Sequence, residues 1–231
     1  MLTRSIWMAF VGLAVTPVQA AAVCPTNVAS GCVISYCDRI ESSSPTWAAG
    51  IVGGSFSLDL IAGTMEMRSS GCSPHQSCGA GLTATDLYQV VGPASANPIP
   101  FEVRVALTGS ITAEVRSYPH HGNLCSGAEV RFVLSADAAS AQFSDVNGDQ
   151  PCAGKTITGS LALPLARVPG EWFPIRYDLS ASAYGGDGTI RGALSFANLP
   201  AGYSIVSCQG SGAPPVATLP SSWGRLQQVY R

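Results

Sequence analysis

Eight cysteines are the residues of this chain whose type and spacing could do the most chemistry, as disulfide bridges or as metal ligands. They are Cys24, Cys32, Cys37, Cys72, Cys78, Cys125, Cys152 and Cys208. A natural turn separates Cys72 from Cys78, so we expect a bridge between these two. A second bridge from Cys125 to Cys152, and bridges among the other four, would complete a framework that stabilises the fold by about 2–4 kcal/mol per bridge.

Zinc or copper binding is the alternative use for part of this set. Cys72, His75 and Cys78 have the spacing of metal ligands, and His120 and His121 could supply two more. The two histidines follow a proline and precede a glycine, which predicts a loop, where such pairs are usually solvated. We favour bridges over a metal centre because the N-terminal segment reads as an export signal, and exported cysteines leave the reducing cytosol.

The run DVNGD at 145–149 offers a different metal chemistry. Asp145, Asn147 and Asp149 place oxygen-bearing side chains at alternate positions, as at the opening of an EF-hand calcium loop. The next residue is Gln150 rather than the glycine of such loops, and no acid stands at the twelfth position. These three residues are our candidate calcium ligands, and the plainer interpretation is an acidic turn between strands.

Exposed aromatic side chains could stack on sugar rings, as they do in lectins. The candidates near predicted strand ends and loops are Trp47, Tyr118, Trp172 and Tyr184. Aromatic residues make up only 8% of the chain, so most of them are expected in the core.

Signatures of catalysis are absent from the sequence, which has no Gly-x-Ser-x-Gly elbow, no His-Glu-x-x-His and no phosphate-binding loop. Glu66, Glu171 and Asp178 could in principle pair as the acid and nucleophile of a glycosidase. Their positions on separate predicted strands favour solvent-facing charge instead. The sequence therefore predicts a protein that is not an enzyme.

The elements that position these side chains are expected to be strands. Apolar and polar residues alternate with period two, and helical periodicity is nearly absent. Two long hairpins are predicted, Phe101–Ser117 with a turn at 108–110 and Trp172–Ala197 with a turn at 185–188. Further strands are expected near 86–91, 128–135, 140–144, 156–163 and 202–208. This pattern predicts an all-β, two-sheet antiparallel sandwich of jelly-roll or immunoglobulin-like kind, stapled by disulfides.

The chain divides into four expected parts. Residues 1–20 read as a signal peptide, with an alternative cleavage after residue 22, because the apolar stretch Ile6–Val15 is too short to span a bilayer. Residues 21–209 form the sandwich, 210–220 a linker rich in glycine and proline, and 221–231 a short amphipathic tail. No later segment is apolar enough for a transmembrane helix, and the scattered basic residues give no footprint for nucleic acid.

Three stretches resemble parts of uncharacterised exported bacterial proteins. LPAGYSIVSCQG at 199–210 resembles the end of β-sandwich domains in such proteins. TDLYQVVGPASANPIPFEVRVALTGS at 85–110 is similar to a strand–loop–strand pattern in surface proteins that carry C-terminal sorting signals. SSWGRLQQVYR at 221–231 resembles a Trp-Gly-Arg ending on other exported bacterial proteins. The resemblance implies a structural module and brings no catalytic residues with it.

Together these features predict a secreted or cell-surface β-sandwich protein without catalytic activity. We expect a structural or adhesive role at the bacterial surface or matrix, with surface polysaccharide or other envelope proteins as partners. The alternatives are a carbohydrate-binding module, with calcium as the one cofactor considered, and a polysaccharide-active enzyme.

Overall fold

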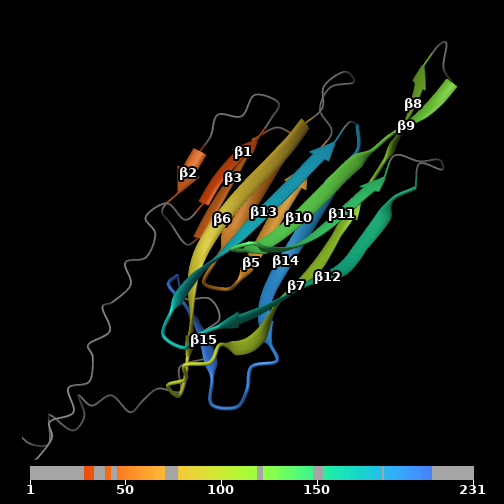
Figure 1. Ribbon diagram of the computed structural model, residues 1–231. Helices are drawn as coiled ribbons and strands as arrows, with labels where there is room; N and C mark the ends of the chain where they lie inside the picture. Colours follow the sequence, from red (N-terminus) through yellow and green to blue (C-terminus); the bar gives the residue numbers. More distant parts are fainter. Residues whose placement is uncertain are drawn as a thin grey trace, which may run out of the picture.

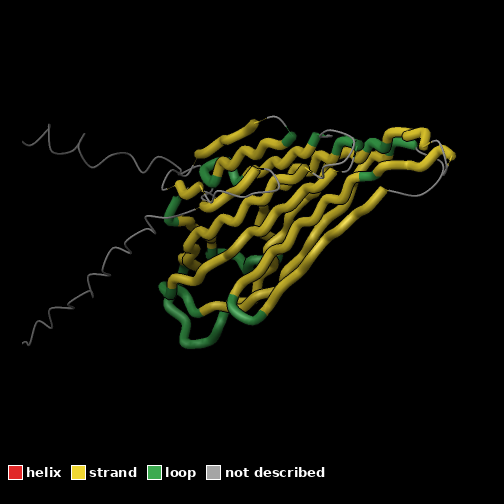
Figure 2. The backbone as a smooth tube through the Cα atoms, turned by 90° about the horizontal axis from the view of Figure 1, so that it is seen from above, coloured by secondary structure: helices red, strands yellow, loops and turns green. Residues whose placement is uncertain are grey.

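The computed structural model describes residues 29–33, 40–42, 46–51, 53–70, 78–118, 122–147, 153–183 and 185–209. These residues form strands and turns, with no helix among them, and therefore none long and apolar enough to cross a membrane. The strands run in one long direction, and loops lie at their ends (Figure 2).

Most of the strands belong to two antiparallel sheets (Figure 1). Sheet A has the order β11 (Ala139–Asn147), β10 (Ala128–Ala136), β13 (Trp172–Ala183), β6 (Cys78–Val91), β1 (Ala29–Val33) and β2 (Ile40–Ser42), and β15 (Ser204–Ser207) also pairs with β6. Sheet B has the order β12 (Lys155–Arg167), β7 (Ile99–Ile111), β14 (Gly188–Ala197), β5 (Thr64–Ser69), β4 (Gly54–Asp59) and β3 (Thr46–Ile51). A third, two-stranded sheet of β8 (Glu114–Tyr118) and β9 (Gly122–Ser126) extends beyond the ends of the other strands (Figure 1).

The inner faces of sheets A and B share one apolar core, so the predicted two-sheet sandwich is confirmed. In a strand, successive side chains point to opposite faces, and the burial of β7 alternates accordingly. Its residues Phe101, Val103 and Val105 are buried, whereas Arg104 and Ala106 are exposed. Burying one such apolar side chain contributes about 1.5–3 kcal/mol, so the alternation fixes which face of each strand looks inward.

One corner of the core is polar. Asp86 on β6 is fully buried and accepts a hydrogen bond from the hydroxyl of Ser207, with 2.6 Å between Oδ2 and Oγ. The hydroxyls of Tyr88 and Tyr177 are 2.8 Å apart and are equally buried. Because buried polar groups are costly without partners, the Ser207–Asp86 bond holds the short strand β15 against β6, together with the backbone bond from Cys208 N to Leu87 O of 2.8 Å. The tyrosine pair joins β6 to β13.

The first predicted hairpin is wrong. The expected turn at 108–110 lies inside β7, which continues straight to Ile111 and pairs with β12 and β14. The predicted turn glycine, Gly109, instead permits a close approach of two backbones. A Cβ atom at this position would lie 2.1 Å from the carbonyl oxygen of Thr189 on β14.

The second predicted hairpin is also wrong, although both of its strands exist. β13 belongs to sheet A and β14 to sheet B, so the segment at 185–187 crosses between the sheets. Leu179 on β13, for example, pairs with Leu82 and Phe132 in sheet A rather than with a residue of β14. The crossing segment is tied to the end of β7 by the bond from Thr112 N to Asp187 O of 2.7 Å.

The second error has its cause in the way the chain alternates between the sheets. From β11 to β15, each successive strand lies in the opposite sheet. Neighbours in the sequence therefore face one another across the core instead of pairing side by side. Period-two alternation looks the same in both arrangements, because in each case the apolar residues point inward.

The cysteines are described only in part. Cys78 and Cys208 are disulfide-bonded residues rather than free thiols. The predicted Cys72–Cys78 and Cys125–Cys152 pairs each include a residue outside the described ranges. The predicted disulfide framework, like the signal peptide, the linker and the tail at 221–231, therefore stays a prediction.

Candidate functional site

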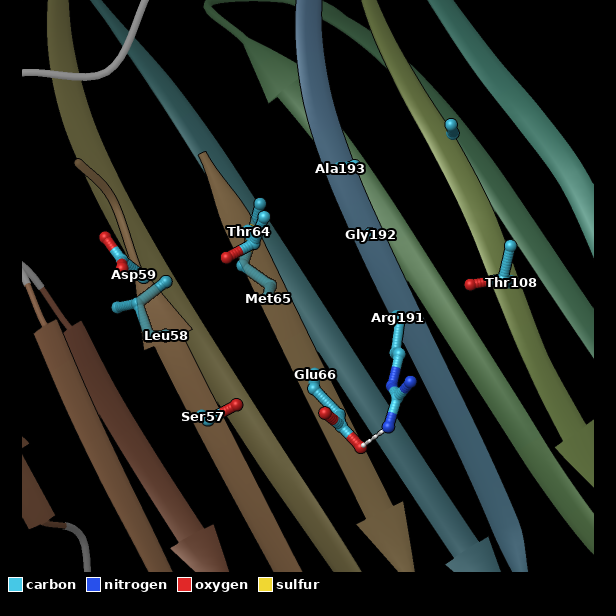
Figure 3. Close-up of a pocket in the computed structure, with 11 residues that line it drawn as sticks. Ser57, Leu58, Asp59, Thr64, Met65, Glu66, Thr108, Arg191, Gly192 and Ala193 are labelled. Atoms are coloured by element: carbon cyan, nitrogen blue, oxygen red, sulfur yellow. Dashed lines mark hydrogen bonds and ion pairs between the residues drawn. The ribbon is translucent and has the colours of Figure 1, made fainter. Parts of the chain in front are cut away.

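A groove crosses the outer face of sheet B, the face turned away from the core. It encloses about 340 Å³. It passes over four neighbouring strands, β4, β5, β14 and β7 (Figure 3). Its lining residues are Ser57, Leu58, Asp59, Thr64, Met65, Glu66, Ala106, Thr108, Arg191, Gly192 and Ala193.

The polar side of the groove is a single cross-strand row, which we call the polar row. Ser57 pairs with Glu66, Glu66 with Arg191, and Arg191 with Thr108 in the register of the sheet. These four side chains lie in a line across the four strands in Figure 3. Since neighbouring strands are separated by about 4.8 Å, the row is roughly 14 Å long.

The adjacent row forms the floor of the groove, and we call it the floor row. It consists of Asp59, Thr64, Ala193 and Ala106, paired in that order. Three of the four side chains are alanine or threonine, shorter than the Glu66 and Arg191 side chains beside them. The groove is hollow because short side chains stand next to long ones on an otherwise regular sheet.

Gly192 lies between these rows in sequence and points toward the core. A Cβ atom there would lie 2.6 Å from Cε2 of Phe132, a fully buried residue on β10 of sheet A. It would also lie 3.1 Å from Cγ1 of Val105 on β7. The phenyl ring of the opposite sheet therefore packs directly beneath the strand that carries Arg191 and Ala193.

The electrostatics of the groove are set by one ion pair. The guanidinium of Arg191 donates to the Glu66 carboxylate, with 3.0 Å between Nη2 and Oε1, and both side chains stay accessible at 63% and 36%. Asp59 accepts a hydrogen bond from the backbone N–H of Ala62 at 2.8 Å, at the turn between β4 and β5. The groove can thus offer guanidinium donors, carboxylate acceptors and the hydroxyls of Ser57 and Thr108 to a ligand.

Asp59 and Glu66 line the same groove, so their suitability for acid–base chemistry has to be considered. They are diagonal neighbours on β4 and β5, because the direct partner of Glu66 is Ser57. In Figure 3 the Glu66 carboxylate points toward Arg191, and the Asp59 carboxylate points away from it. The two acids are bound to different partners and do not converge on one point, as the two carboxylates that flank a scissile bond must.

The predicted calcium ligands do not form a metal site among the residues that the structure describes. Asp145 and Asn147 lie within β11 rather than in a turn, and Asp149 is outside the described ranges. The Asp145 carboxylate binds Lys155 on β12, with 2.6 Å between Oδ1 and Nζ. No group of three metal-ligating side chains occurs in the described ranges. A calcium site completed by Asp149 remains a hypothesis.

The other predicted site residues are scattered. Of the three acids, Glu66 lies in the groove, Asp178 is on the outer face of sheet A, where it binds Arg176 at 2.9 Å, and Glu171 is in a loop. Trp47 is half-buried and stacks edge-on against Phe56, with 4.5 Å between ring centroids.

The remaining aromatic and metal candidates are Trp172, which the structure describes, and five residues whose side chains it does not describe. Trp172 is partly buried at the start of β13. The side chain of Tyr118 and residues Tyr184, His120 and His121 lie outside what the structure describes, as does His75 of the zinc or copper hypothesis.

Sequence reasoning did not find the groove, because its residues meet only through strand pairing. Glu66 and Arg191 are 125 positions apart in the chain. The one available signal was the composition of the outward-facing positions. Thr64 on β5, Ala193 on β14 and Ala106 on β7 are small residues that alternate with buried apolar residues or, on β14, with Gly192 and half-buried Leu194.

Comparisons with known proteins add little to this geometry. No protein-family model matches the chain, and no curated protein matches it. One similar solved structure is that of TmCBM61 in complex with β-1,4-galactotriose, at 14% sequence identity. The match covers 56% of this chain and 69% of that one with a TM-score of 0.27, a likeness too low to carry an argument about function.

Proposed function

We propose that this protein is an exported, non-catalytic adhesion protein that holds a polysaccharide in the groove of sheet B. The observation that carries the proposal is the pairing of the polar row with the floor row. Ser57, Glu66, Arg191 and Thr108 supply hydrogen-bonding groups along one side, and small residues leave room beside them. A polysaccharide presents the matching chemistry, which is hydroxyl groups at its edges and C–H groups on its ring faces.

The shape of the groove supports a chain as ligand rather than a small molecule. The groove runs across the strands from β4 to β7, so an extended polymer can lie along it. Ala106 pairs with Ser160, so the floor row continues onto the edge strand β12 with another small, exposed residue. A polymer held in this way would link the protein to a surface or matrix, in keeping with the export signal read from the sequence.

A groove-filling substitution tests this proposal. Ala193→Trp puts a large side chain on the floor row, and Ala162→Trp makes the same change at an exposed alanine of sheet B outside the groove. Binding to a panel of immobilised polysaccharides should be lost with Ala193→Trp and kept with Ala162→Trp. Equal binding by the two variants would exclude the groove as the binding site.

A polysaccharide-active enzyme is the second candidate, and the observation in its favour is that Asp59 and Glu66 line one groove. Incubation with the bound polymer distinguishes the two functions. We expect no new reducing ends over a day at neutral pH. New reducing ends with the wild type that disappear with Asp59→Asn would show hydrolysis and overturn the non-catalytic proposal.

A further inference from the structure

We infer that the polymer held in the groove is an uncharged glycan, and that the Glu66–Arg191 ion pair selects it over acidic polysaccharides. This inference rests on the proposed function, because it names the class of ligand for the same groove. It goes beyond that function because an acidic polysaccharide would satisfy the adhesion proposal equally well.

The charge of the groove is the first argument. Its lining contains two carboxylates, Asp59 and Glu66, and one guanidinium, Arg191, which is already bound to Glu66. The adjacent outward-facing cations are Arg68 on β5, two residues after Glu66, and Arg104 on β7, two residues before Ala106. Arg104 is bound to Glu102, so counting these groups only balances the charges. An acidic polymer would bring its own carboxylates against Asp59 and Glu66 without a surplus of positive charge to receive them, and like charges at such positions repel.

The geometry of the ion pair is the second argument. Glu66 and Arg191 sit directly opposite each other on neighbouring strands, in contact at 3.0 Å, and both are open to solvent on the groove side. Such a pair presents fixed donors next to fixed acceptors. Two neighbouring hydroxyls of one sugar ring can meet both, one hydroxyl donating to the carboxylate and the other accepting from the guanidinium. A carboxylate or sulfate group on the ligand cannot do this, because it accepts hydrogen bonds and has none to donate to Glu66.

The neighbouring floor row completes the recognition of an uncharged ring. Thr64, Ala193 and Ala106 present methyl groups beside the ion pair. The C–H face of a sugar ring can lie on these methyl groups while its hydroxyls reach the polar row. The apolar face of the ring thus contacts apolar groups and its hydroxyls contact polar groups, and the ligand needs no charged group of its own.

The test compares each neutral polymer with its own charged derivative. Amylose, dextran and galactan are immobilised beside their carboxymethylated forms, and binding is measured at low and high salt. The wild-type protein should bind at least one neutral polymer, bind its carboxymethylated form at least tenfold more weakly, and show little dependence on salt. Preference for the carboxymethylated form, weakened by salt as charge attraction is, would overturn the inference.

Variants of the ion pair provide a second test of the inference. Glu66→Gln and Arg191→Gln should each weaken binding of the neutral polymer by about tenfold, the effect of losing one charge-assisted hydrogen bond. Glu66→Lys should weaken neutral binding and increase binding of the carboxymethylated polymer. The control is Arg176→Gln, which breaks a similar exposed pair with Asp178 on the outer face of sheet A and should change nothing. Neutral binding that is indifferent to Glu66→Gln and Arg191→Gln would contradict the role of the pair.

The two proposals fail in different ways. If a charged polymer binds and Ala193→Trp abolishes that binding, the groove is an adhesion site and only the inference is overturned. If no polymer binds, or Ala193→Trp leaves binding intact, the proposed function itself is overturned. Melting temperatures of all variants within a few degrees of the wild type confirm that each compared protein is folded.

Discussion

The two faces of sheet B are built from the same strands but from opposite kinds of side chain. On the inner face β5 contributes Met65 and Met67, both buried, and on the outer face it contributes Thr64 and Glu66. The inner face gains its free energy from removing apolar area from water. The outer face does not have to bury apolar area, so its residues can be short, charged or hydroxylated. The difference shows that alternation along one strand separates what stabilises the fold from what can recognise a ligand.

The largest effect on stability is expected from truncating a side chain in the core that the inner face covers. Phe132→Ala removes a fully buried phenyl ring that packs between the sheets. It should lower the free energy of unfolding by about 3–5 kcal/mol, the usual cost of such a truncation. Urea denaturation measures the change. A loss below about 1 kcal/mol would mean that the ring is not a central part of the core.

A smaller effect on stability is expected at Gly192, where β14 packs closely against Phe132 of sheet A. Gly192→Ala adds a methyl group that would lie 2.6 Å from the Phe132 ring. Overpacking of this size should cost about 1–3 kcal/mol, and the shifted strand should also weaken polysaccharide binding through Arg191 and Ala193. The double variant Gly192→Ala/Phe132→Leu should cost less than the sum of its single changes. Additive costs would show that the glycine and the ring do not interact.

The polar corner of the core provides a test by pH. Burial raises the pKa of Tyr177 well above its ordinary value, with added contributions from Tyr88 and Asp86. In the unfolded chain the tyrosine ionises near pH 10, so above that pH the unfolded state has lost a proton that the folded state keeps. Stability is therefore fully present below about pH 10 and falls as pH rises beyond it.

Tyr177→Phe should remove this contribution to the alkaline loss of stability. The variant should cost about 1 kcal/mol at pH 7, because its hydroxyl contact with Tyr88 is lost. It should then lose less stability than the wild type between pH 9 and pH 11. Thermal unfolding across this range measures both quantities. Parallel curves for the two proteins would exclude Tyr177 as the titrating group.

The smallest effect on stability is expected on the outer faces. Arg191→Gln and Arg176→Gln each break an exposed ion pair, and such pairs contribute about 0–1 kcal/mol. The two variants should have nearly the same urea midpoint as the wild type and differ only in polysaccharide binding. A large loss of stability with Arg191→Gln alone would indicate a structural role for the pair.

The sequence was a good guide to which residues face inward. Alternation within the predicted strands of 101–117 and 172–197 places apolar residues on one face, and Phe101, Val103, Ile175 and Ile190 in these ranges are buried. This succeeded because the side-chain period of a strand is local and needs no knowledge of its partners.

Strand pairing and the groove could not be predicted in the same way. Whether Gly109 belongs to a turn or to a close contact between strands depends on Thr189, which is remote in the sequence. The groove likewise depends on a register that aligns Glu66 with Arg191 and Thr64 with Ala193. Register is a property of strand pairs, and the pattern of side chains along one strand contains no direct record of it.

The alternation of the chain between the two sheets has a consequence for how the molecule is made. Hardly any strand from β11 to β15 can be completed by a neighbour synthesised just before or after it. Proteins dominated by such distant pairings fold in milliseconds to seconds, far more slowly than helical bundles of equal size. During that interval the unpaired edges of β7 and β13 are open to other chains. We therefore expect refolding yields to fall steeply with protein concentration, and a chaperone that delays pairing should raise them.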